Sequence, residues 1–241
     1  MNTQYFFFDG VDSRDYGIYL SSAIKIGGAK PNVEKISVPG RNGSLLFYEG
    51  GFADVSFSLE CFVVGDDAQG NVAAISQWLL GTEGYRELRF PWEDGCRKAY
   101  VVSGPETEAL ASGVRAFSLE FECAPQVYID AGQETFELTN GEILHNEWMA
   151  ARPLIEVYGS GDGTIRVGGT AVTITELRPT PGIYLDCETQ NAYAYGLNAT
   201  VANQNSRIQA LEFPTLPHGD TKISWTSNIT KVRITPRWWH L

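Results

Sequence analysis

The sequence predicts a mainly β protein with two domains, the first of which also contains one helix. Many short segments alternate apolar and polar residues with a period of two, as half-buried strands do. The 241 residues include 25 glycines and 11 prolines, and 12% of them are aromatic, a composition typical of short strands joined by tight turns. Only one segment has helical periodicity. The length suits one large β domain or two smaller ones.

The elements of the first third include an unusual hairpin. We expect a strand over residues 4–8, a turn at Asp9-Gly10, and a strand over residues 15–20 that ends before Gly27-Gly28. The next two strands are expected at residues 35–38 and 44–48, with Asn42-Gly43 between them. Asn-Gly is a strong hairpin signal because both residues tolerate positive φ. This hairpin is long and need not lie on the body of its domain.

A strand and a helix follow the hairpin. Residues 53–64 alternate clearly, with Val55, Phe57, Leu59 and Cys61 on one face. The helix is expected to begin at Asn71 as its N-cap and to end at Gly81. Its apolar face is formed by Val72, Ile75, Trp78 and Leu79. Further strands are expected over residues 85–90, 97–102 and 115–123, the last with Phe117, Leu119 and Phe121 on one face.

The pattern changes near Ala124-Pro125. We therefore assign residues 1–130 to the first domain and residues 131–241 to a second domain made of strands with short connections. Strands about ten residues apart, separated by Gly, Asp and Pro turns, are typical of a β-sandwich. They are expected at residues 135–138, 154–158, 164–167, 171–175, 183–186, 222–225 and 231–235.

Charge and cysteine content limit the possible functions and locations. A formal net charge of −11 argues against coating nucleic acid, which needs a basic surface. It is compatible with solubility, with a basic partner, or with a passage through which DNA slides. Cys61, Cys123 and Cys187 lie in apolar alternating segments, and with Cys96 they are expected to be reduced and structural. The N-terminal segment lacks signal-peptide features, and no segment is long and apolar enough to span a membrane.

No motif indicates catalysis, a metal or a cofactor. Asp9, Asp12 and Asp15 do not have the spacing of a calcium loop, so we interpret them as turn formers. The glycine-rich segment 159–163 leads into a strand rather than a helix, so we interpret it as a hairpin turn and not as a phosphate site. The three histidines are scattered, at His145, His218 and His240, and no nucleophile motif accompanies them.

The tryptophans near the C-terminus are candidates for a sugar or partner contact. Trp225 lies in an alternating strand and is expected in the core. Trp238 and Trp239 are adjacent, so in an extended segment one would point inward and the other outward. The outward ring could bind a sugar or a neighbouring chain.

Several segments, taken in order, resemble the distal tail proteins of phages with long non-contractile tails. The opening resembles theirs from Phe8 to Ile18, and Pro39-Gly40-Arg41-Asn42-Gly43 resembles the tip of their long hairpin. Further matches are Trp78-Leu79-Leu80 with Tyr85 and Leu88; Arg152-Pro153-Leu154-Ile155 with Gly159-Ser160-Gly161; Phe213-Pro214-Thr215-Leu216 with Gly219, Ile223 and Trp225; and Ile234-Thr235-Pro236-Arg237-Trp238-Trp239.

This resemblance implies a fold: an N-terminal β-sandwich with one helix and a long belt hairpin, followed by a galectin-like C-terminal β-sandwich. It implies the short form of the family, without an inserted carbohydrate-binding domain. The hairpin residues Val38, Pro39, Gly40, Arg41, Asn42, Gly43 and Leu45 would then lie in the interface between subunits.

The resemblance also implies a role. The protein would form a homo-hexameric ring, or stacked rings, at the virion tail tip after assembly in the host cytoplasm. The ring would join the tail tube protein to the tail-tip hub and receptor-binding proteins, and DNA would pass through its channel without specific binding. No enzyme activity, cofactor or membrane contact is implied. The alternative that remains open is a carbohydrate-binding module for host adhesion.

Overall fold

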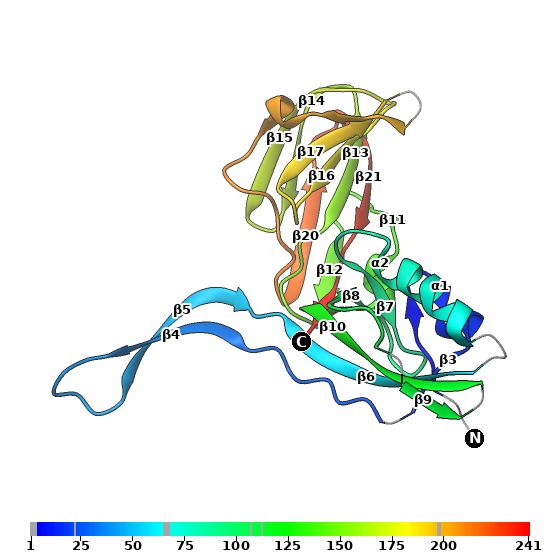
Figure 1. The fold of residues 1–241 in the computed structure, drawn as a ribbon. Helices are drawn as coiled ribbons and strands as arrows, with labels where there is room; N and C mark the ends of the chain where they lie inside the picture. The colour runs from blue at the N-terminus through cyan, green and yellow to red at the C-terminus, as the bar shows by residue number, and fades with distance from the viewer. Residues whose placement is uncertain (1–3, 22, 65–67, 107, 112, 197–198) are drawn as a thin grey trace. The chain divides into compact units, whose positions relative to one another are not determined.

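The computed structural model describes residues 4–21, 23–64, 68–106, 108–111, 113–196 and 199–241. The chain divides into two compact units, residues 1–127 with Leu241 and residues 128–240. Both are built mainly of strands (Figure 1), which confirms the predicted fold class.

The main sheet of the first unit has the strand order β2-β1-β7-β8-β10-β6-β3, and β9 pairs with β10. The strands are β1 (Phe7–Phe8), β2 (Val11–Asp12), β3 (Ile18–Leu20), β6 (Val55–Val64), β7 (Arg86–Arg89), β8 (Cys96–Val101), β9 (Glu108–Ala111) and β10 (Val114–Tyr128).

The pairing of β6 with β10 forms the centre of this sheet. The two strands run antiparallel in continuous register, from Val55 opposite Cys123 to Val64 opposite Val114. Burial alternates strictly along β6, as its sequence predicts. The inner face of the pair is formed by Val55, Phe57, Leu59, Cys61, Val63, Phe117, Leu119, Phe121 and Cys123.

The sheet bends over its own core. Two strands separate β1 from β10, which in a flat sheet would place them roughly 14 Å apart. The rings of Phe8 and Phe121 are nevertheless only 5.6 Å apart, and those of Phe6 and Phe121 are 6.0 Å apart. One continuous core therefore lies between the two halves of the sheet, as in a sandwich.

Helix α1 (Ala68–Leu80) covers this core, with Ile75 and Leu79 buried as predicted. The predicted N-cap is wrong, because Asn71 lies inside the helix, which begins three residues earlier. Trp78 anchors the helix: its ring stacks on Tyr16 at 4.7 Å, and its indole N–H donates to the Phe8 carbonyl at 3.2 Å.

The N-terminal segment differs from the prediction in two places. The strand predicted over residues 4–8 is regular only at β1, and the predicted strand 15–20 begins with a 3₁₀ helix, η1 (Ser13–Tyr16), before β3. Asp12 starts η1 because its side chain accepts a hydrogen bond from the Arg14 N–H at 2.8 Å. The predicted turn is correct: Asp9 and Gly10 both have positive φ and connect β1 to β2.

The second unit is a β-sandwich, as predicted. Its two sheets have the orders β11-β21-β13-β16-β17-β18 and β12-β20-β14-β15-β19. The strands are β11 (Phe136–Glu137), β12 (Ile143–Asn146), β13 (Leu154–Gly159), β14 (Gly161–Val167), β15 (Thr170–Leu177), β16 (Ile183–Asp186), β17 (Asn191–Tyr195), β18 (Val201–Asn203), β19 (Ile208–Gln209), β20 (Gly219–Trp225) and β21 (Ile229–Thr235). The other elements after residue 128 are α2 (Asp130–Gln133), η3 (Asn205–Arg207) and β22 (Trp239–His240).

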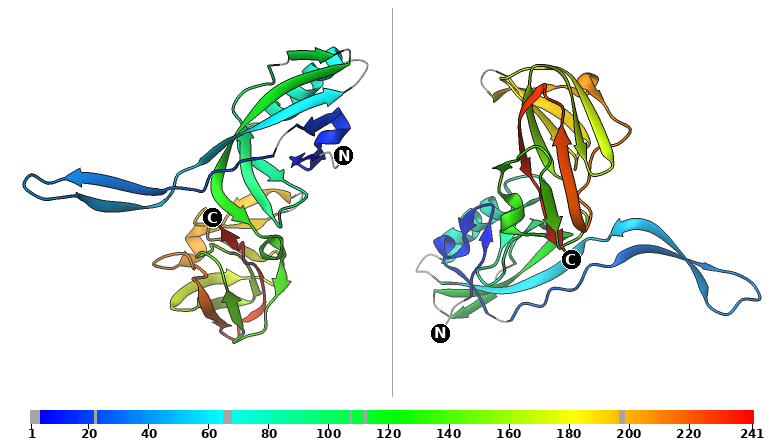
Figure 2. Two further views of the ribbon diagram at one scale, coloured as in Figure 1. Left: turned by 90° about the horizontal axis from the view of Figure 1, so that it is seen from below. Right: turned by 180° about the vertical axis from the view of Figure 1, so that it is seen from behind.

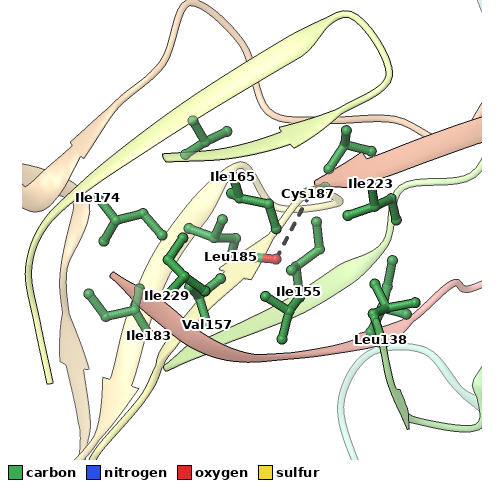
Figure 3. Close-up of a cluster of buried hydrophobic side chains, with 14 of the residues drawn as sticks. Leu138, Ile155, Val157, Ile165, Ile174, Ile183, Leu185, Cys187, Ile223 and Ile229 are labelled. Atoms are coloured by element: carbon green, nitrogen blue, oxygen red, sulfur yellow. Dashed lines mark hydrogen bonds between the residues drawn. The ribbon is translucent and has the colours of Figure 1, made fainter. Parts of the chain in front are cut away.

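Branched aliphatic side chains from both sheets fill the sandwich (Figure 3). Ile155 and Leu185 come from one sheet, and Ile165 and Ile223 from the other. Cys187 lies among them, and burial raises the pKa of its thiol to about 12. All four cysteines are free and buried, as predicted.

The glycine-rich segment 159–163 is not the predicted hairpin turn. Strand β13 pairs with β16 and β21, whereas β14 pairs with β15 and β20. The segment therefore carries the chain from one sheet of the sandwich to the other. Periodicity along one strand could not predict this, because it does not specify which strand lies alongside.

A core substitution tests the packing of the first unit. Phe121 is fully buried against Phe6, Phe8 and Phe57. We expect Phe121→Ala to destabilise the first unit by about 3–5 kcal/mol, because it removes a large buried ring and leaves a cavity. Chemical denaturation measures this. The matched control on the exposed face of β6, Ser58→Ala, should change stability by less than about 0.5 kcal/mol.

Candidate oligomer interface

Residues 31–52 form an isolated hairpin, here called the arm. Its strands are β4 (Pro31–Ser37) and β5 (Ser44–Phe52), which pair with each other and with no further strand in the described residues. The arm extends away from the main sheet of the first unit (Figures 1 and 2). Both strands therefore leave one edge of backbone N–H and C=O groups without a neighbouring strand, an arrangement that favours pairing with another chain.

Both faces of the arm carry large apolar side chains. Ile36 lies opposite Leu45 on one face, together with Phe47. On the other face Val33 lies opposite Tyr48, and Lys35 opposite Leu46. An uninterrupted apolar run such as Leu45 to Tyr48 is typical of a strand that is buried on both sides.

These side chains are nevertheless exposed in the single chain. Leu45, Leu46, Phe47 and Tyr48 retain 44%, 50%, 56% and 64% of their surface. Contiguous exposed apolar surface of this kind marks interaction sites. The arm is therefore a candidate interface that a partner covers.

The tip of the arm is a six-residue loop between the paired residues Ser37 and Ser44. The Arg41 N–H donates to the Val38 carbonyl at 3.2 Å, and Gly40 has φ +77°. With Pro39 before Gly40, these are the features of a type II turn. Gly43, at φ +79°, then leads into β5. Asn42 does not have positive φ, so the hairpin exists but the expected Asn-Gly turn does not.

The base of the arm continues directly into the main sheet. Gly50 and Gly51 both have positive φ and form an irregularity in the register of β5. The Ala53 N–H then donates to the Lys30 carbonyl at 2.8 Å, which holds the two strands together at the base. β6 begins only two residues later, at Val55. The arm is thus an extension of the longest strand pairing of the first unit.

All seven residues predicted for the interface lie on the arm. Val38, Pro39, Gly40, Arg41, Asn42 and Gly43 make up the tip loop and are exposed, and Leu45 lies on β5. Of the exposed apolar residues on the paired strands, only Leu45 was predicted, although the run Leu45-Leu46-Phe47-Tyr48 is visible in the sequence.

The predicted contact residues Trp238 and Trp239 lie elsewhere, in the second unit. Both are half-buried against the sandwich core, and a contact of either ring with a sugar or a neighbouring chain stays a prediction. Arg237, directly before the pair, has φ +57°. The Trp239 indole donates to the Ala150 carbonyl at 3.1 Å. Trp225 is also half-buried against this core.

A tyrosine cluster on the second unit was not predicted. Tyr184 and Tyr193 lie opposite each other on β16 and β17 and stack at 5.3 Å, while Tyr195 packs edge-on against both. Their neighbours Leu185, Ala192 and Ala194 point into the core, so the tyrosines line the outer face of the six-stranded sheet. Tyr195 is 42% exposed. Pairing across strands creates this cluster, which spacing in the sequence does not reveal.

A buried ion pair stabilises the same sheet. Asp186 accepts from Arg237 at 2.6 Å and from the N–H groups of Glu188 and Thr189 at 3.1 and 3.4 Å. Burial alone would raise the pKa of Asp186, but these hydrogen bonds and the Arg237 charge outweigh it and hold the pKa below its usual value.

The remaining candidate residues have structural roles. Asp9 lies in a turn and Asp12 pairs with Arg14 at 2.6 Å. His145 pairs with Asp220 at 2.6 Å on the surface. Within the described residues, no three His, Cys, Asp or Glu side chains gather as metal ligands. In the same part of the chain, no helix is both long enough and apolar enough to cross a membrane.

Comparison with solved structures confirms the predicted fold. The chain matches the Dit (gp 19.1) protein of phage SPP1 over 100% of both chains, with a TM-score of 0.71 and 14% identity. That protein is described as a paradigm of the hub adsorption apparatus in phages that infect Gram-positive bacteria. A chain of the phage P2 baseplate in its activated conformation, solved with calcium and with strontium, matches with a TM-score of 0.58 and 8% identity over 97% of both chains. No protein-family model and no curated protein matches the sequence.

The Asp186–Arg237 pair predicts a pH-dependent stability. We expect Arg237→Met to destabilise the second unit by about 2–3 kcal/mol at pH 7, because it leaves a buried carboxylate without its cation. Since the pKa of Asp186 is lowered in the folded chain, its contribution is present above about pH 4 and is lost as the pH falls through that lowered pKa. The difference between wild type and variant should therefore shrink in acid.

Urea denaturation between pH 3 and pH 7 measures this difference. The control is Arg207→Met, whose partner Glu176 is 71% exposed and whose loss should cost less than about 1 kcal/mol. A difference that stayed constant down to pH 3 would contradict the role given to the pair.

Proposed function

We propose that this protein is a structural component of a phage tail tip. Six copies form a ring that joins the tail tube to the tip and receptor-binding proteins and leaves a channel through which DNA passes. The proposed units are a ring-forming N-terminal domain, residues 1–130, and a galectin-like C-terminal domain, residues 131–241.

The match in fold over the full length of the chain supports this proposal. Two proteins of phage adsorption hubs and baseplates share the architecture of both units and not of one alone. With 14% and 8% identity, the similarity concerns fold, and the role is carried over as a proposal.

The exposed arm is the observation that carries the proposal. It exposes large apolar side chains on both of its faces, and surfaces of this kind mark sites of interaction. Its contact with the next subunit would be heterologous, between different surfaces of the two chains, and repetition of such a contact closes into a ring when the rotation permits. The Trp238 and Trp239 pair is not needed for this contact.

The charge of the chain suits a DNA passage. At −11, each copy repels phosphate, and a ring would add up this charge around its opening. DNA would slide past such a surface without binding, since tight binding needs many basic contacts to the backbone.

Removal of the arm tests the proposal. Val33 and Tyr48 are opposite each other, so residues 34–47 can be replaced by Asn-Gly, a two-residue turn that suits a hairpin. We expect the wild type to sediment as a hexamer of the 26.6 kDa chain and the variant as a monomer with an unchanged melting temperature. Analytical ultracentrifugation and negative-stain imaging measure this.

The control keeps the arm intact and changes an exposed residue of the second unit, Glu212→Ala, which should leave the ring unchanged. A ring of normal size in the chain without the arm would contradict the role of the arm. A wild type that stays monomeric at every attainable concentration would contradict the ring itself.

The second candidate function is carbohydrate binding for host adhesion, and the tyrosine cluster is the observation that favours it. Aromatic side chains next to polar groups form platforms for sugars, and Tyr195 is accessible. If this function holds, Tyr195→Ala should weaken binding of the wild type to a host cell-wall polysaccharide by about tenfold in calorimetry, while Tyr48→Ala should not. The absence of any saturable heat with the wild type would exclude it.

A further inference from the structure

We infer that one face of the arm, the face with Lys35, docks on the exposed face of the β6–β10 pair in the next copy of this chain. This inference rests on the proposed function, which requires an interface between copies but does not say where on the neighbour the arm binds.

The first argument is the distribution of charge within the first unit. From Lys35 to Tyr48, the arm holds two basic side chains, Lys35 and Arg41, and no acidic one. The unit outside residues 22–52 holds 6 basic and 15 acidic side chains, a net charge of −9. The whole arm, with Glu34 and Glu49 added, has no net charge, so the attraction to the acidic remainder of the unit depends on which side of the arm faces the neighbour.

The second argument is the segregation of charge between the two faces of the arm. Lys35 shares its face with Leu46 and Tyr48, and that face has no acid. Glu34 and Glu49 belong to the opposite face, with Phe47. The Lys35 face is thus the one that suits an acidic surface. Lys35 and Arg41 form no ion pair within the described part of the chain.

The third argument is the receiving surface. The outer face of β6 and β10 presents three carboxylates, Glu60, Glu120 and Glu122, among three serines, Ser56, Ser58 and Ser118. All six are exposed except Glu122, which is half-buried and accepts from the Tyr100 hydroxyl. Ser56 lies opposite Glu122, Ser58 opposite Glu120, and Glu60 opposite Ser118.

Size is complementary as well as charge. Small serines leave room above the sheet for the large Leu46 and Tyr48 side chains, and the carboxylates lie beside them for Lys35 and Arg41. Lys98, a cation on β8 of the same sheet, lies opposite Glu87 on β7. The core already covers the inner face of the β6–β10 pair, and the docked arm would cover its exposed outer face.

Charge reversal on each side, and on both together, tests the inference. The variant Lys35→Glu/Arg41→Glu and the variant Glu60→Lys/Glu120→Lys should each raise the concentration needed for half-assembly about tenfold or more, because each places like charges in contact. The four substitutions combined in one chain should restore assembly to near the wild-type concentration. Ultracentrifugation over a concentration series measures this in the full chain.

The matched control is Glu147→Lys/Glu212→Lys, which changes the net charge equally on exposed residues of the second unit and should leave assembly unchanged. Circular dichroism melting of each variant separates lost folding from lost assembly. Two outcomes would overturn the inference: wild-type assembly of both reversed variants, or failure of the combined variant to recover. If assembly still requires the arm in either case, the proposed function stands and only the docking surface is wrong.

Discussion

The continuous ladder between β6 and β10 is the constraint on which the rest of the first unit depends. It aligns every second side chain from Val55 to Val63 with its partner on β10, so that one face of the pair becomes apolar and the other polar. The apolar face packs with Phe6, Phe8, Phe90 and helix α1 into one core. A slip of one residue would exchange the two faces, so the register is strongly specified.

The same ladder determines where the arm begins. β5 runs into β6 through Ala53 and Asp54, so the rigid centre of the sheet supports the arm at its base. The arm has no core of its own, and its strands cannot cover the apolar side chains that they carry. A partner that covers these side chains would therefore stabilise the arm. The body of the first unit thus has a core of its own, whereas the arm leaves its apolar side chains exposed.

The second unit, unlike the arm, has an apolar core of its own. This core lies between two sheets. Ion pairs connect charged side chains on the six-stranded sheet: Arg233 with Glu156 at 3.2 Å, and Arg237 with Asp186. Such buried pairs cost desolvation, so they fix the arrangement of strands more than they add stability. In the tyrosine cluster on the same sheet, Tyr195 is the exposed member.

The sequence by itself determined the strands with regular alternation, the position of the hairpin, the buried cysteines and the resemblance of fold, because period and turn chemistry are local properties. It could not determine the start of α1, the 3₁₀ turn at Ser13, or the path of residues 159–163, where capping, side-chain hydrogen bonds and strand partners decide. Trp238 and Trp239 are both half-buried against the core, directly after Arg237 at positive φ. Only the tertiary structure revealed that Tyr184, Tyr193 and Tyr195 meet on one face and that the polar faces of β6 and β10 lie side by side, since strand pairing brings these residues together.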